Sequence, residues 1–279
     1  MKEENFCKKV YFYKINSLPA RFFCMMKANI IKYLILLMVL LCARLAFSQN
    51  AYWGDNKTIY KMATILSRTE DSVIKQFQRQ HLNWPPEAIY IRNFKYDRQL
   101  EVWVKEDTSS QFKLFKTYKI CMQSGTMGPK RMEGDYQVPE GFYHINDFNP
   151  NSNYHLSLGI NYPNASDRIL SDSVRPGGSI YIHGNCVSTG CIAISDQPIE
   201  ELYVVASAAK SKGQEFIPVH IFPARYSNTQ SLNFLNNAIK DNSYLQHFNK
   251  NIRLAFDYFE KNKNLPIIMV NRNGDYVIN

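Results

Sequence analysis

Between residues 88 and 222, short β-branched and aromatic segments alternate with glycine, proline, aspartate and serine turns. No other feature constrains the fold of this chain as strongly, because such segments are too short and too irregular in period to be amphipathic helices. We therefore predict a mainly β domain over 88–222. The predicted strands lie within Ala88–Ile91, Leu100–Val104, Phe112–Met122, Phe142–Ile145, Tyr154–Leu158, Ser179–His183, Ile192–Ile194 and Phe216–Phe222.

Helices are predicted inside this domain and on both sides of it. Residues 49–87 form an N-terminal helical segment, with Ser67 or Thr69 as the expected cap. Within the domain, Asp196 and Pro198 are a cap-and-proline start for a helix that runs to about residue 212. Residues 223–279 contain two helices over 228–262 and a small hairpin of 267–270 with 276–278.

Composition and charge exclude several classes of protein. The chain has 279 residues, of which 45% are apolar and 20% are charged, so it is neither disordered nor collagenous. The net charge of +9 suggests a nucleic-acid-binding protein, but residues 1–48 contain eight of the basic and two of the acidic side chains. Residues 49–279 therefore have 25 basic and 22 acidic side chains, a net charge of +3, and no basic run with interleaved aromatic residues. We exclude nucleic acid as a partner.

Residues 1–48 have the features of a secretory leader. An apolar run from Tyr33 to Phe47 follows Lys27 and Lys32, and small residues precede a cleavage point after Ser48. The run is short for a bilayer span and contains Arg44, so we favour a cleaved signal peptide. An uncleaved membrane anchor and a lipoprotein lipidated at Cys42 are the two alternatives. Residues 1–24 are atypical of a leader, which suggests that translation starts at Met25 or Met26. The predicted location is the periplasm or cell envelope.

Export changes how the cysteines are interpreted. Cys121, Cys186 and Cys191 remain after the leader, an odd number for an oxidising compartment. One thiol must therefore stay free or pair with another molecule. A disulfide between Cys121 and Cys186 that leaves Cys191 free is one arrangement.

The segment from His183 to Cys191 contains the residues best suited to chemistry. A thiol is a weak nucleophile until a base or a positive neighbour promotes the thiolate, and a histidine on an adjacent strand supplies such a base. Gly184 and Gly190 allow the backbone to approach a substrate closely. Two other interpretations are a buried structural cysteine and a metal site of His183, Cys186 and Cys191, which would lack a fourth ligand nearby.

The pattern His-Gly-x-Cys-Val-Ser-x-Gly-Cys over 183–191 resembles the active-site segment of YkuD-type L,D-transpeptidase catalytic domains, in particular their YafK-like branch. The resemblance covers residues 88–222 and extends, in order, to further motifs. These are Tyr118–Cys121, Gly128–Lys130, Glu133–Asp135, Pro139–Tyr143 and Tyr162–Arg168.

This resemblance implies a β-sandwich-like catalytic domain and assigns roles to individual residues. Cys191 matches the nucleophile, His183 matches the general acid and base, and Ser188 and Gly190 match the turn that shapes the oxyanion hole. The implied activity is attack on a peptidoglycan stem peptide through a thioester, followed by cross-linking or by attachment of a protein lysine. Hydrolysis at the same Cys/His site, as by an L,D-carboxypeptidase or amidase, and a non-catalytic wall-binding module are alternatives. No cofactor or metal is implied.

The sequence departs from the family at two positions. Thr189 stands where a basic residue or histidine is frequent, and Ala193 stands where an arginine is frequent. The sequence therefore does not decide which residue binds the substrate carboxylate; the candidates are Arg168, Arg175 and Lys130. The substrate-binding candidates at this stage are Gly184, Arg168, Tyr154 and His155. We expect Asp167 and Arg168 to form a local ion pair.

Overall fold

The computed structural model describes residues 37–38, 60–65 and 67–279. The predictions about the leader fall on residues 1–48 and, apart from Leu37 and Met38, lie outside the described residues. By its contacts the chain divides into residues 1–57 and 58–279, and the following description concerns the second unit. No helix in the described part of the chain combines the length and hydropathy of a membrane span.

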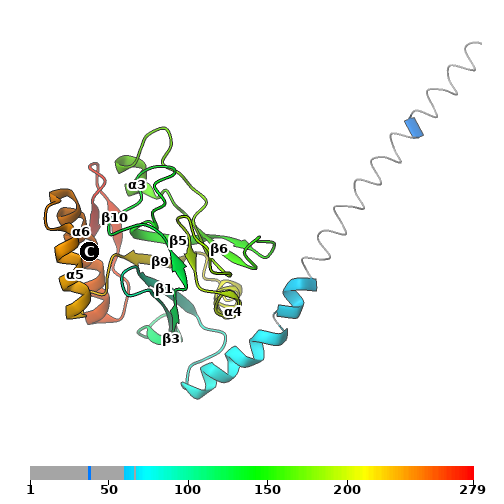
Figure 1. The fold of residues 1–279 in the computed structure, drawn as a ribbon. Coiled ribbons are helices and arrows are strands. Elements are labelled where there is room, and N and C mark those ends of the chain that lie inside the picture. The colour runs from blue at the N-terminus through cyan, green and yellow to red at the C-terminus, as the bar shows by residue number, and fades with distance from the viewer. Residues whose placement is uncertain (1–36, 39–59, 66) are drawn as a thin grey trace, which may run out of the picture. The chain divides into compact units, whose positions relative to one another are not determined.

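The second unit is built around one nine-stranded mixed sheet (Figure 1). Its strand order is β3-β2-β1-β9-β5-β6-β7-β8-β4, and the pairs β1/β9 and β7/β8 are parallel. The strands are β1 (Ala88–Phe94), β2 (Gln99–Lys105), β3 (Lys113–Lys119), β4 (Met122–Gln123), β5 (Gly141–Asn149), β6 (Ser157–Ile160), β7 (Tyr181–His183), β8 (Ile192–Ala193) and β9 (Ile217–Phe222). The mainly β fold is confirmed.

Helices cover both faces of the sheet (Figure 1). Residues 60–65 and 67–79 are helical and precede β1. The labelled elements outside the large sheet are α3 (Ala165–Leu170), α4 (Asp196–Ser211), α5 (Thr229–Ile239), α6 (Ser243–Asn262) and the hairpin of β10 (Ile268–Val270) with β11 (Tyr276–Ile278).

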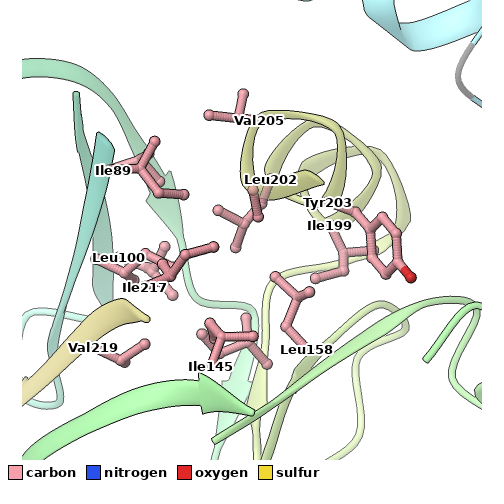
Figure 2. Close-up of a cluster of buried hydrophobic side chains, with 14 of the residues drawn as sticks. Ile89, Leu100, Ile145, Leu158, Ile199, Leu202, Tyr203, Val205, Ile217 and Val219 are labelled. Carbon is pink, nitrogen blue, oxygen red and sulfur yellow. The ribbon is translucent and has the colours of Figure 1, made fainter. Parts of the chain in front are cut away.

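The main core lies between the inner face of the sheet and α4. Figure 2 shows Ile199 and Leu202 of α4 facing sheet residues that include Ile89 and Leu158. Phe115 of β3, at one edge of the sheet, belongs to the same buried cluster as Ile192 of β8, near the other edge, so the sheet curls around this core.

The outer face of the sheet is buried as well. Phe94 of β1 and Phe222 of β9 form a second cluster with residues of α5, α6 and the C-terminal hairpin, among them Leu235 and Phe256. The side chains of β1 therefore belong to different cores. Ile89 and Ile91 are in the cluster that packs on α4, whereas Phe94 is in the cluster that contains residues of α6. Burial on both faces explains why these strands show only partial alternation in sequence.

Local differences from the predicted elements have simple causes. The strand predicted over 154–158 begins only at Ser157, because His155 has a positive φ of 75° and lies in a turn. Ser67 and Thr69 were expected to cap the N-terminal helix, but both are themselves helical. The short helix α3 was not predicted; Asn164 and Asp167 form its capping box.

A buried ionic cluster joins the outer face of the sheet to α6. The Arg92 guanidinium, which is 1% exposed, lies 2.7 Å from a carboxylate oxygen of Glu101 and 2.7 Å from one of Glu260. Glu101 also accepts from Arg225 at 2.6 Å and from the Trp103 indole N–H at 2.7 Å. Every oxygen of Glu101 is thus matched to a donor, which buried charges require.

We expect Glu101→Gln to lower the free energy of unfolding by about 3–5 kcal/mol, because it leaves the buried guanidinium of Arg92 and the half-buried guanidinium of Arg225 without their shared carboxylate. Urea unfolding followed by circular dichroism measures this change. Arg253→Gln is the control, since it breaks an exposed pair with Asp257 (3.2 Å) and should cost at most about 1 kcal/mol. Equal effects of the two substitutions would contradict the proposed importance of burial.

Candidate active site

The parallel pairing of β7 with β8 brings the end of one strand, His183, near the start of the other, which Cys191 immediately precedes. Ile182 pairs with Ile192 and His183 pairs with Ala193, so Cys191 lies two positions before the partner of His183. Ile182 and Ile192 enter the main core. Since successive side chains of a strand point to opposite faces, His183 and Cys191 share the face away from that core.

His183 is held in one tautomer. Its ring Nδ1 lies 2.5 Å from the carbonyl oxygen of Gly184, and a carbonyl only accepts, so Nδ1 donates. In the neutral ring the lone pair is therefore on Nε2. Burial lowers the pKa of His183, although the bond to Gly184 opposes this shift. The imidazole is accordingly neutral at pH 7 and able to accept a proton.

Tyr154 covers the ring of His183. The two ring centroids are 4.7 Å apart with an interplanar angle of 32°, whereas the outer part of Tyr154 is exposed. The sequence analysis placed Tyr154 at the groove on a strand, but it reaches His183 from the turn before β6.

Cys191 is a free, partly exposed thiol in the residue immediately before β8. Its Sγ lies 3.8 Å from the carbonyl oxygen of Ser179. Burial raises the pKa of the Cys191 thiol, and a backbone hydrogen bond from Tyr181 and the positive charge of Lys130 partly offset this rise. Unlike a cysteine with a cationic neighbour in contact, Cys191 rests as a thiol beside a neutral imidazole.

The turn between the two residues depends on local hydrogen bonds. The Ser188 hydroxyl donates to the carbonyl of Cys191 at 2.7 Å and accepts from the Gly190 N–H at 3.2 Å. Gly190 has a φ of +132°, which strongly favours glycine. The Gly190 N–H, an expected oxyanion donor, is thus bonded to Ser188 in this structure.

Gly184 is required for a different reason. A Cβ there would lie 2.7 Å from a carboxylate oxygen of Asp196 and 2.9 Å from the Tyr154 carbonyl oxygen. The Asp196 carboxylate accepts from the Asn185 N–H at 2.7 Å. Asp196 was predicted as the cap of α4, but the N-cap is Ser195, whose side chain makes no capping hydrogen bond. Asp196 instead fixes the backbone after His183.

A disulfide links this turn to the strand next to it. Cys121 and Cys186 are bonded, with their Cα atoms 5.7 Å apart. Cys121 lies between β3 and β4, and its N–H donates to the carbonyl of Ala193 at 2.9 Å. The arrangement considered from cysteine parity, with Cys191 left free, is the one found.

Cys191 opens into a cleft of about 540 Å³ with two cationic side chains in its wall. Lys130 and Arg175 line the cleft together with Glu133, and a run of small residues forms one side. The small and apolar lining residues include Gly134, Pro176, Gly177, Gly178, Ser179 and Gly190.

Lys130 is almost completely buried in this wall. Its ammonium donates to an Asp135 carboxylate oxygen at 2.5 Å and to the Met132 carbonyl at 2.8 Å. An ammonium has three N–H donors, and these two bonds leave the third without a hydrogen-bond partner among the described residues. Glycine at position 177 is required here, because a Cβ would lie 2.9 Å from the Lys130 Cε.

Two predicted substrate-binding residues lie away from this cleft. Arg168 is exposed on α3 and is absent from the cleft lining. Its expected ion pair with Asp167 is wrong, because Asp167 pairs with Arg131 at 2.9 Å. His155 lines a separate acidic cavity of about 580 Å³, where its Nε2 lies 2.6 Å from Glu200.

The sequence analysis missed the roles of Asp196 and Asp135, which hold Asn185 and Lys130 respectively. The Glu-Gly-Asp turn at 133–135 was noted, but no local signal connects it with Lys130. Within the described residues, no group of three potential ligand side chains is arranged for a metal ion.

Comparison with known proteins identifies the family of the chain. A sequence model of the L,D-transpeptidase catalytic domain (YkuD) matches residues 95–221. The protein named "Putative L,D-transpeptidase YafK" of Escherichia coli (strain K12) is 35% identical over 214 residues, which cover 76% of this chain and 81% of that protein.

Solved structures are more distant. The helical cell shape determining protein Pgp2 (K307A mutant) of Campylobacter jejuni is 26% identical, with a TM-score of 0.40, over 50% of this chain and 48% of that chain. L,D-transpeptidase 1 of Mycobacterium tuberculosis is 13% identical, with a TM-score of 0.28, over 48% and 61%. The chain thus spans less than two thirds of either solved chain. From the YkuD match and the identity with YafK, the chain belongs to the L,D-transpeptidase (YkuD) family.

Proposed function

We propose that the protein is an exported cysteine-dependent L,D-transpeptidase that acts on peptidoglycan stem peptides. The observation that carries the proposal is the strand register, which places a free thiol at the cleft and a neutral, buried histidine on the same face of the sheet. His183 keeps its Nε2 lone pair because Nδ1 donates to Gly184, and Cys191 immediately precedes the strand that pairs with β7. Export is supported by the Cys121–Cys186 disulfide, since disulfides persist mainly in oxidising compartments.

In the proposed reaction, Cys191 attacks the carbonyl at the L-centre of diaminopimelate in a tetrapeptide donor. The thiol proton passes to Nε2 of His183 as the carbon–sulfur bond forms. The tetrahedral intermediate then collapses, terminal D-Ala leaves with that proton on its amine, and a thioester remains. An acceptor amine attacks the thioester, gives its proton to His183 and restores the thiol. The acceptor is a second stem peptide or a protein lysine.

Stabilisation of the oxyanion would require a change in one hydrogen bond. The Gly190 N–H now donates to Ser188 at 3.2 Å, a long bond that a charged oxygen can replace. Ser188 would keep its bond to the Cys191 carbonyl, which is shorter at 2.7 Å. The turn would thus present its amide without rearranging the strand.

Lys130 is the proposed anchor for the substrate carboxylate, in place of the family arginine absent at Ala193. Its ammonium lines the cleft that contains Cys191, has one free donor and is fixed by Asp135. Arg168 lies outside this cleft.

We expect Cys191→Ala and His183→Gln each to abolish turnover. Mass spectrometry of defined tetrapeptide muropeptides and cross-linked sacculi incubated with the protein measures this directly. His247→Gln, an exposed histidine on α6 paired with Asp275, is the matched control and should retain activity. Cross-linked or amine-exchanged products identify a transpeptidase, whereas shortened stems without exchange identify a hydrolase. Unchanged substrates with the native protein would favour a wall-binding module.

We expect the acid side of the kcat/KM profile to have its midpoint below pH 6.5. Burial lowers the pKa of His183, so the base loses its lone pair only at a lower pH than an exposed histidine does. Tyr154→Ala admits water to the ring and should move the midpoint upward. Tyr258→Ala, a partly exposed tyrosine of α6, should leave the profile unchanged. If Tyr154→Ala leaves the midpoint of the acid side unchanged, then burial by Tyr154 does not set the pKa of His183.

We expect Lys130→Met to raise KM for a donor with a free terminal carboxylate roughly tenfold, the loss of one charged hydrogen bond. The same variant should leave KM unchanged for a donor whose terminal carboxylate is an amide. Lys240→Met, at an exposed lysine after α5, is the matched control. An equal rise for both donors would show that Lys130 is structural rather than a carboxylate anchor.

A further inference from the structure

The Cys121–Cys186 disulfide lies next to the catalytic candidates in sequence and in space. Cys186 follows His183 by three residues and precedes Cys191 by five. Cys121 precedes β4, the strand that pairs with β8 through Met122 and Ala193. The bond therefore joins the turn between the two candidates to the edge of the sheet that supports both.

Few hydrogen bonds attach the turn of residues 184–190 to the rest of the protein. Asn185 is tied to Asp196, but the bonds of Cys186, Ser188 and Gly190 are to atoms within 185–191. In the part of the chain that the structure describes, no hydrogen bond joins residues 186–189 to a segment outside this turn. Their one cross-link to the sheet is the disulfide.

The two sulfur-bearing residues differ in accessibility. Cys186 is exposed, whereas Cys121 is only partly exposed. Thiol–disulfide exchange requires access of an attacking thiolate to one sulfur. Cys186 is the accessible end of the bond.

We propose that the Cys121–Cys186 disulfide is a redox-controlled latch for the turn 184–190, and that a dithiol protein of the cell envelope opens it. When the latch is closed, the turn holds Cys191 in its register beside His183. When it is open, residues 186–189 lose their attachment and turnover falls. This proposal rests on the proposed function, because it concerns regulation of the same site.

Opening of the disulfide needs only the dithiol protein as reductant. A thiolate of the dithiol protein attacks Cys186 Sγ, the bond to Cys121 breaks, and Cys121 leaves as a thiolate that takes a proton. The second thiol of the partner then attacks the mixed disulfide and releases Cys186. The partner ends as a disulfide, having supplied two electrons and two protons.

The test compares the purified protein before reduction, after reduction by TCEP and desalting, and after reoxidation by oxidised glutathione. Peptide mapping after iodoacetamide treatment reports which of Cys121, Cys186 and Cys191 is free. The rate of Cys191 alkylation across pH and the turnover of tetrapeptide muropeptides are measured on each sample. We expect reduction to change the alkylation profile of Cys191 and to lower kcat at least tenfold, with recovery on reoxidation.

The double variant Cys121→Ser, Cys186→Ser should reproduce the reduced state and stop responding to TCEP. Tyr226→Phe, which removes a hydrogen bond to Asn249 far from the turn, controls for general loss of stability and should leave Cys191 alkylation unchanged. Unchanged kcat and an unchanged alkylation profile after full reduction of the disulfide would overturn the latch. If no form turns over muropeptides, the proposed function fails, and the alkylation profile still decides for or against the latch.

Discussion

The parallel pairing of β7 with β8 is the constraint on which the site depends. Parallel neighbours are normally joined by a crossover of a dozen or more residues. Here residues 184–191 make the connection, with Ile182 and Ile192 anchored in the main core. So short a return requires unusual backbone, which Asn185 (φ 59°) and Gly190 (φ 132°) supply. The same short connection places Cys191 two positions before the residue that pairs with His183.

Burial of the site decides how its nucleophile can form. It lowers the pKa of His183 and raises that of Cys191, so both groups are neutral at rest. In the proposed reaction, a thiolate therefore arises only when the thiol proton moves to Nε2 of His183 as the sulfur attacks. The positive charge of Lys130, in the wall of the cleft, lowers the pKa of Cys191 and so partly offsets the effect of burial. A site of this kind protects its thiol from chance oxidation, because thiolate character drives that reaction.

Local sequence signals predicted most of the strands correctly and singled out His183 and Cys191 as candidates, whereas they did not predict contacts between residues far apart in the sequence. His183 and Cys191 lie within nine residues of each other, so their motif can be read from one short segment. The strands of the sheet are rich in β-branched and aromatic residues, which also is a local signal. Partners brought together by the fold gave no such signal. Asp196 has the local appearance of a helix cap but bonds to Asn185, and Asp167 bonds to Arg131 rather than to its neighbour Arg168. Sequence could not choose between Lys130 and Arg168 for the same reason.

The C-terminal hairpin contributes to the cleft through a chain of contacts. The Tyr276 hydroxyl of β11 accepts from Asn164, which caps α3, and Asn164 also binds the backbone N–H of Asp167. Asp167 in turn holds Arg131, the residue after Lys130. Because each member is buried or partly buried, none can be removed without leaving a polar group unpaired. The segment after β9 is therefore part of the structure that positions the wall of the cleft.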